Sequence, residues 1–311
     1  MAKGIVGNGT IGGNGGNHFW ETKYDKGAMV EEIIVWKEGN ILRGLKLSWT
    51  DGSDSTMIGK SSGSSQSFTF KVKEKCTEMV LRGNGIGTRC GHIEFKTDQG
   101  NSFSWGDGGS DNYYMDVGSG FLVGFQGRAN LDIDSLGPLF LKPLKSVHSE
   151  VDYGDFPNGA PDPTHITLDT QDFDGNHEYE WDFHGSKTKT TTSTWSQTLA
   201  SSFDLQVKVK AGVPELAEVE STIKWGLSAS STHSQAEQDS SEIGWDVHST
   251  VSPGQTVHCE AYCFQGTSDV DYTSTVTVTF QSGETLQFKE SGTFSGVTYS
   301  EAKTTVNYTP P

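Results

Sequence analysis

The sequence predicts an all-β protein, and three observations support this fold class. Glycine is abundant, with 38 residues among 311, and turn-forming sequences interrupt the chain at short intervals. Alternation of apolar and polar residues, which is the period of a half-buried β-strand, recurs along the chain. The chain has few long helical patterns, and no apolar run approaches the ~20 residues that a transmembrane helix needs. We therefore expect short strands in the first half and long, twisted strands in the second.

Charge and the N-terminus restrict the possible partners and location. The formal net charge is −17, which argues against nucleic acid because neutralising phosphates requires Lys and Arg. The same charge argues against recruitment by anionic lipid alone. The opening sequence lacks the apolar stretch of a signal peptide. We expect a soluble chain without a signal peptide, either cytoplasmic or released, that reaches a target cell membrane by another signal.

Enzyme motifs and metal sites are not predicted. The sequence contains no GxSxG, HExxH or P-loop pattern, so we expect no enzyme, no catalytic residue and no cofactor. His177 and His184 flank three acidic residues and are the one candidate for a metal site. On a strand they would lie on opposite faces, about 23 Å apart, so we expect a surface strand and no metal.

The four cysteines favour reduced thiols. Cys259 and Cys263 would lie about 13 Å apart on one strand, which is too far for a disulfide without a bulge or a turn. Cys76 and Cys90 flank a strand and a glycine-rich loop, and pairing between them stays open. Isolated cysteines without CxxC spacing are more often free.

Residues 1–145 form the first predicted domain, in which short strands alternate with glycine turns. Turns at 50–53 and 98–101 separate the strands. This spacing predicts a closed or prism-like domain. The predicted strands are 31–36, 45–49, 78–81, 92–95 and 121–125.

Three segments of this domain carry a family resemblance: the glycine run 12–17, the segment 91–98, and the segment 120–127 followed by 130–134. Together they resemble jacalin-related lectins, which implies a β-prism of three four-stranded sheets that binds mannose-type glycans on cell-surface glycoproteins. The resemblance implies a sugar site in which Gly16 contributes its backbone, Leu131 and Asp132 their amides, and Asp134 its carboxylate, with Arg89 as a further hydroxyl donor.

Asn130 departs from the family, which has glycine at this position. An ionised carboxylate beside amide donors suits a pair of sugar hydroxyls. The alternative is that Asp132 and Asp134 are ordinary loop acids.

Residues 146–311 form the second predicted domain, and a segment at about 202–230 dominates it. Two alternating arms flank a turn at 213–217, so the segment predicts a hairpin with one apolar and one charged face. A half-buried hairpin in a soluble sheet is one interpretation. The other is a membrane-inserting pair, because each arm has about the 9–11 residues of a transmembrane β-strand. Such a pair needs copies from other chains to close a barrel.

The order of elements around the hairpin resembles the aerolysin family. Ser/Thr-rich stretches at 188–198 and 228–241 flank the hairpin, and a Pro-Gly turn at 251–257 leads into further strands. With the lectin-like domain, this order is similar to natterin-like proteins. The resemblance implies an elongated twisted β-sheet module that oligomerises on glycans and inserts a β-barrel into the lipid bilayer, with cytolysis and immune defence as roles. The residues expected to face lipid are Phe203, Leu205, Val207, Val209, Val213, Leu216, Val219, Ile223, Trp225 and Leu227. The alternative is a non-lytic lectin whose β-rich second domain serves oligomerisation.

Overall fold

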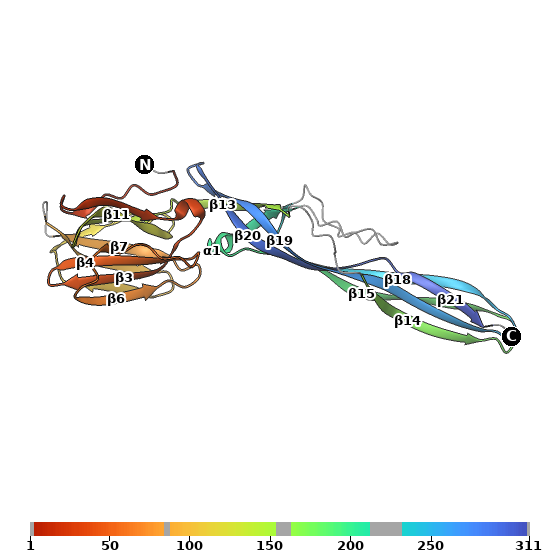
Figure 1. The fold of residues 1–311 in the computed structure, drawn as a ribbon. Coiled ribbons are helices and arrows are strands. Elements are labelled where there is room, and N and C mark those ends of the chain that lie inside the picture. Colours follow the sequence, from red (N-terminus) through yellow and green to blue (C-terminus); the bar gives the residue numbers. More distant parts are fainter. Residues whose placement is uncertain (1–2, 84–87, 154–162, 212–231, 310–311) are drawn as a thin grey trace. The chain divides into compact units, whose positions relative to one another are not determined.

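A computed structural model of the chain describes residues 3–83, 88–153, 163–211 and 232–309 (Figure 1). The chain divides into two compact units. The first consists of Met1–Ser149, Thr198–Val207 and Thr275–Glu290, and the second of Glu150–Gln197, Lys208–Ser274 and Ser291–Pro311. The domains 1–145 and 146–311 stay a prediction.

Three four-stranded antiparallel sheets build the N-terminal part of the first unit (Figure 1). One sheet has the order β1-β12-β11-β2, with β1 Ile11–Gly12, β2 Asn17–Thr22, β11 Leu122–Ala129 and β12 Ile133–Phe140. The next has the order β5-β4-β3-β6, with β3 Val30–Glu38, β4 Ile41–Trp49, β5 Ile58–Gly59 and β6 Ser64–Thr69. The last has the order β10-β7-β8-β9, with β7 Cys76–Gly83, β8 Cys90–Thr97, β9 Ser102–Gly106 and β10 Asp111–Tyr114. A single 3-10 turn, η1 Tyr24–Lys26, follows β2.

One apolar core joins the three sheets, as a β-prism requires. Ile33 on β3, Phe95 on β8 and Phe125 on β11 come from the three different sheets and are all fully buried in the same cluster. Buried residues alternate with exposed or half-buried ones along much of β3 and β4, which is why the two-residue period predicted these strands. The all-β fold class and the prism are confirmed.

The other strands belong to one nine-stranded sheet with long members. Its order is β17-β16-β13-β19-β20-β15-β18, and β14 and β21 also pair with β19. Figure 1 shows β14, β15, β18 and β21 as long, twisted strands. Their bounds are β13 Leu144–Asp152, β14 Thr164–Asp174, β15 Tyr179–Ser196, β16 Val207–Lys210, β17 Thr232–His233, β18 Ala236–Val251, β19 Thr256–Phe280, β20 Thr285–Tyr299 and β21 Lys303–Thr309. Long twisted strands in this part are the aerolysin-type fold that the sequence predicted.

The second unit has its own core, which Cys259 and Cys263 on β19 enter from the same face. Both side chains are fully buried beside Trp181 and Phe183 of β15. Side chains four residues apart lie on the same face of an extended strand, which is why both cysteines enter this core.

One local element differs from the prediction. Residues 203–206 are not a strand: a short helix, α1 Leu199–Ser202, precedes them, and β16 begins only at Val207. The buried Glu290 accepts hydrogen bonds from the amides of the first two helix residues, which stabilises the turn. Phe203 is buried, with its ring centroid 6.0 Å from that of Phe121 and 6.3 Å from that of Phe288. These contacts come from β20 and from the residue before β11, so the local pattern did not reveal them.

No helix among the described residues has both the length and the apolar character needed to cross a membrane.

Replacing Phe95 of β8 by alanine tests the prism core. Its ring centroid lies 5.0 Å from that of Phe68 and 5.1 Å from that of Phe103, and it is 1% exposed. We expect Phe95→Ala to lower the free energy of unfolding by about 3–5 kcal/mol, because the cavity cannot close. Urea titration followed by tryptophan fluorescence measures the loss. Val72→Ala, at a side chain that is 77% exposed, is the control and should leave the midpoint nearly unchanged. Equal midpoints for both variants would contradict this description of the core.

Candidate functional site

Two loops meet at one end of the sheet β1-β12-β11-β2. The loop between β1 and β2 carries the glycine run, and the loop between β11 and β12 carries residues 130–132. They meet because β1 pairs with β12, placing Gly12 opposite Ser135. The amide of Gly13 donates a 2.8 Å hydrogen bond to the carbonyl of Asp134. Both segments that the sequence assigned to a sugar site therefore lie side by side.

Glycine is required in the first loop because its backbone lies directly against the Asp134 carboxylate. A Cβ on Gly15 would lie 2.5 Å from Asp134 Oδ1, and one on Gly16 would lie 2.6 Å from Oδ2. Gly16 also has a φ of +63°, a conformation that other residues rarely adopt. Arg128 fixes the loop, because its Nε and Nη2 donate 2.9 Å hydrogen bonds to the carbonyls of Gly15 and Gly16.

The carboxylate of Asp134 is enclosed but has few interaction partners among the described residues. Its side chain is only 16% exposed, yet it accepts no hydrogen bond from the described residues. The nearest cation is Arg89, whose Nε lies 3.8 Å from Oδ1. Enclosed polar atoms are nearly always hydrogen-bonded, so such a carboxylate marks a place for donors from a ligand.

Asp132 has a different role from that of Asp134. Its side chain is buried, and both carboxylate oxygens are engaged: Oδ1 accepts from Nη1 of Arg43, and Oδ2 lies 2.9 Å from Nε of Arg89. Its carbonyl accepts a 3.1 Å hydrogen bond from the amide of Asn130, which closes the loop with asparagine in place of glycine. The Asp132 amide as a sugar donor stays a prediction, while its carboxylate anchors two arginines.

The structure thus brings together Gly16, Arg89, Asp132 and Asp134, and it leaves Leu131 64% exposed on the loop between them. Sequence reasoning missed two arginines. Arg128 lies between the segments 120–127 and 130–134 that carried the resemblance and could have been noticed two residues before Asn130. Arg43 comes from β4, 89 residues before Asp132, and no local signal points to it.

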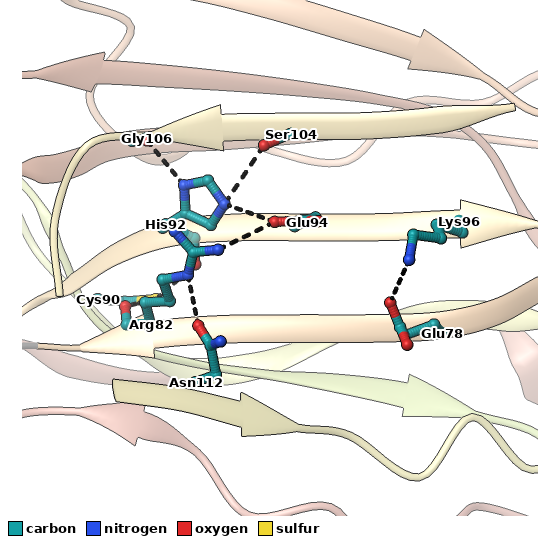
Figure 2. Close-up of polar contacts among 9 residues, drawn as sticks. All are labelled: Glu78, Arg82, Cys90, His92, Glu94, Lys96, Ser104, Gly106 and Asn112. Carbon is teal, nitrogen blue, oxygen red and sulfur yellow. Dashed lines mark hydrogen bonds and ion pairs between the residues drawn. The ribbon is translucent and has the colours of Figure 1, made fainter. Parts of the chain in front are cut away.

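A second polar cluster lies on the sheet β10-β7-β8-β9 (Figure 2). Nδ1 of His92 lies 2.7 Å from the carbonyl oxygen of Gly106, and its Nε2 lies 3.4 Å from Glu94. Arg82 pairs with the same carboxylate at 3.2 Å and donates from Nε to Asn112. The opposite charges are paired across neighbouring strands, which is the pattern of a structural network. No three His, Cys, Asp or Glu side chains within the described residues form a possible metal site.

All four cysteines are free and buried, so Cys76 and Cys90, whose pairing the sequence left open, are unpaired in this structure. Burial raises the pKa of the Cys90 thiol to about 12, and hydrogen bonds from two amides only partly oppose this. Burial likewise raises the pKa of Cys76, Cys259 and Cys263. Thiols of this kind are almost entirely protonated at neutral pH and are poor nucleophiles.

The described part of the predicted membrane hairpin keeps its alternation. Val207 and Val209 are buried on one side of β16, while Lys208 and Lys210 are exposed on the other. Lys210 forms a 3.1 Å ion pair with Glu150 of β13. Leu205 is half-buried ahead of the strand. The other residues expected to face lipid lie outside the described residues: Val213, Leu216, Val219, Ile223, Trp225 and Leu227.

Comparison with known proteins agrees with both parts of this description. The family model of the jacalin-like lectin domain matches residues 8–139, so this part of the chain is similar to jacalin-like lectin domains. The whole chain is similar to the crystal structure of lamprey immune protein, at 29% identity and a TM-score of 0.88 over 99% of this chain and 100% of that one. The chain therefore combines a jacalin-like lectin domain with an aerolysin-type module, as in natterin-like proteins.

Shorter matches cover the lectin domain. Calystegia sepium agglutinin is 22% identical over 46% of this chain and 99% of that one, with a TM-score of 0.37. A mannose-binding jacalin-related lectin from Ananas comosus is 20% identical over 44% and 99%, with a TM-score of 0.36. No curated protein matches the chain.

Neutralising Asp132 tests its anchoring role. Asp132→Asn should lower the free energy of unfolding by on the order of 1–3 kcal/mol, because Arg43 and Arg89 would keep their charges without the shared partner. Chemical denaturation measures the change. Glu78→Gln, which breaks the exposed pair with Lys96, is the matched control and should have a much smaller effect. A larger loss for the control would show that Asp132 is not the anchor.

Proposed function

We propose that this protein docks on cell-surface glycans through the site around Asp134, assembles as a homo-oligomer, and inserts the hairpin at about 202–230 into the lipid bilayer as part of a β-barrel. The observation that carries the docking step is the enclosed Asp134 carboxylate that lacks hydrogen-bond donors from the described chain. The family of residues 8–139 supports the same step.

The chemistry of the site suits neighbouring sugar hydroxyls. In the proposed complex, Asp134 accepts hydrogen bonds from two hydroxyl groups, while the amides of Gly16, Leu131 and Asp132 donate to sugar oxygens. Gly15 and Gly16 leave the approach to the carboxylate free of side chains. A shallow site of this kind binds single sugars weakly, and several copies in an oligomer raise the overall affinity. Mannose-type glycans remain the expected neutral ligands.

The insertion step is supported by the facing of β16. A transmembrane strand alternates apolar residues toward lipid with polar residues toward the lumen. Val207 and Val209 against Lys208 and Lys210 meet this pattern over the described residues. Burial of the two valines supports the proposal, because an apolar strand that is covered before insertion does not promote aggregation. Likeness to lamprey immune protein over the full chain supports a role of the same kind in defence.

Asp134→Asn tests docking. The change keeps the shape but removes the charge that accepts sugar hydroxyls, so we expect at least about a tenfold loss of affinity for immobilised glycoprotein glycans. Surface plasmon resonance on mannose-type glycans measures the loss. Asp111→Asn, at an exposed acid on β10, is the charge-matched control and should bind like wild type. Unchanged binding by a folded Asp134→Asn variant would exclude this site.

A reversible cross-link tests the hairpin. Glu150→Cys with Lys210→Cys replaces an ion pair between β13 and β16 by a disulfide, and both positions are exposed. In liposomes that carry glycoproteins, we expect the oxidised variant to dock but release no dye, and dithiothreitol to restore release. Each single cysteine variant, with and without dithiothreitol, should release dye like wild type.

The outcomes separate the two functions. Release that continues from the fully oxidised variant would show that β16 does not leave β13 during insertion. A wild-type protein that docks on these liposomes but never releases dye would favour the non-lytic lectin.

A further inference from the structure

Arg89 differs from the other arginines around the sugar site. Arg43 is held at Nη1 by Asp132 and at Nε by Glu38 at 3.3 Å. Arg128 is held at Nε and Nη2 by the carbonyls of the glycine loop. Arg89 is held through Nε alone, and its two terminal amino groups have no partner among the described residues. Its side chain is 48% exposed, so these four N–H bonds are available to a ligand.

Asp132 fixes where this guanidinium lies. Its Oδ2 forms an ion pair with Arg89, whose Nε lies 2.9 Å away, and its Oδ1 is already occupied by Arg43. Because the anchoring carboxylate is buried, Arg89 has less freedom than an ordinary surface arginine. A guanidinium held by one edge in this way still presents donors that match the two oxygens of a carboxylate or a sulfate.

The local charge also differs from that of the chain. The whole sequence carries 40 acidic and 23 basic residues. Around the site, Arg43 and Arg89 pair with Glu38, Asp132 and Asp134, and Arg128 adds a third positive charge where it binds the carbonyls of the glycine loop. The site is therefore locally balanced within a strongly acidic protein, which removes much of the repulsion that an anionic ligand would otherwise meet.

We propose that Arg89 forms an acidic-group subsite beside Asp134, so that the preferred glycan carries a carboxylate or a sulfate next to the sugar whose hydroxyls Asp134 accepts. The two roles are separated by charge: Asp134 repels an anion and takes hydroxyls, and Arg89, 3.8 Å away, takes the anion. This inference rests on the proposed glycan docking and names the class of glycan.

Matched pairs of glycans that differ only in the acidic group test the subsite. One pair is a biantennary glycan with and without terminal sialic acid, which supplies a carboxylate. The other is lactosamine with and without a sulfate ester. For wild type we expect at least one acidic member to bind about tenfold tighter than its neutral partner, with the ratio falling toward one at 0.5 M NaCl. Which pair shows the preference identifies the anion.

Arg89→Gln should bring this ratio close to one, because the variant loses more affinity for the acidic glycan than for its neutral partner. Lys96→Gln, which removes an exposed charge at the other end of β8, should keep the wild-type ratio. The inference is overturned if wild type binds neutral glycans at least as tightly as acidic ones, or if Arg89→Gln weakens both members of each pair equally. If wild type binds none of the four glycans and Asp134→Asn changes nothing, the proposed docking function fails instead.

Discussion

The close approach of the glycine loop to β12 is the constraint on which the proposed sugar site depends. A Cβ on Gly12 would lie 2.1 Å from the carbonyl oxygen of Asp134, and the amide of Gly13 is hydrogen-bonded to the same oxygen. Backbone atoms therefore set the distance between the two loops, and side-chain rotamers do not. A site built in this way is largely preformed, so little ordering cost opposes the weak contacts that a sugar makes.

Asp132 and Asp134 show why two nearby acids on one loop need not share a function. They are two residues apart, with Ile133 between them buried in the prism core. The carboxylate of Asp132 forms ion pairs with two arginines. The carboxylate of Asp134 is enclosed without hydrogen-bond donors from the described residues. The difference arises from Arg43, which reaches the loop from another sheet. Electrostatic anchoring by Asp132 and the proposed ligand recognition by Asp134 are thus separate.

The sequence could predict what local patterns encode. Alternation predicted the prism strands and the long strands of the second unit, and a contiguous motif pointed to Gly16 and Asp134. The sequence could not predict the ion pair between Arg43 and Asp132, because these residues lie far apart along the chain. The strand predicted from Phe203 failed for the same reason: Glu290 and Phe288, from β20, stabilise a helical turn and a buried ring there. Long-range contacts outweigh the local period at such positions.

The four free, buried thiols have a consequence for where the fold can persist. All the cysteines of the chain lie among the described residues, and none forms a disulfide. The native state thus gains nothing from an oxidising compartment and loses no covalent bond in a reducing one. Raised thiol pKa values also slow exchange with glutathione, because the thiolate is the reacting species. The same folded protein can accordingly pass between the redox conditions inside a cell and those outside it without chemical change.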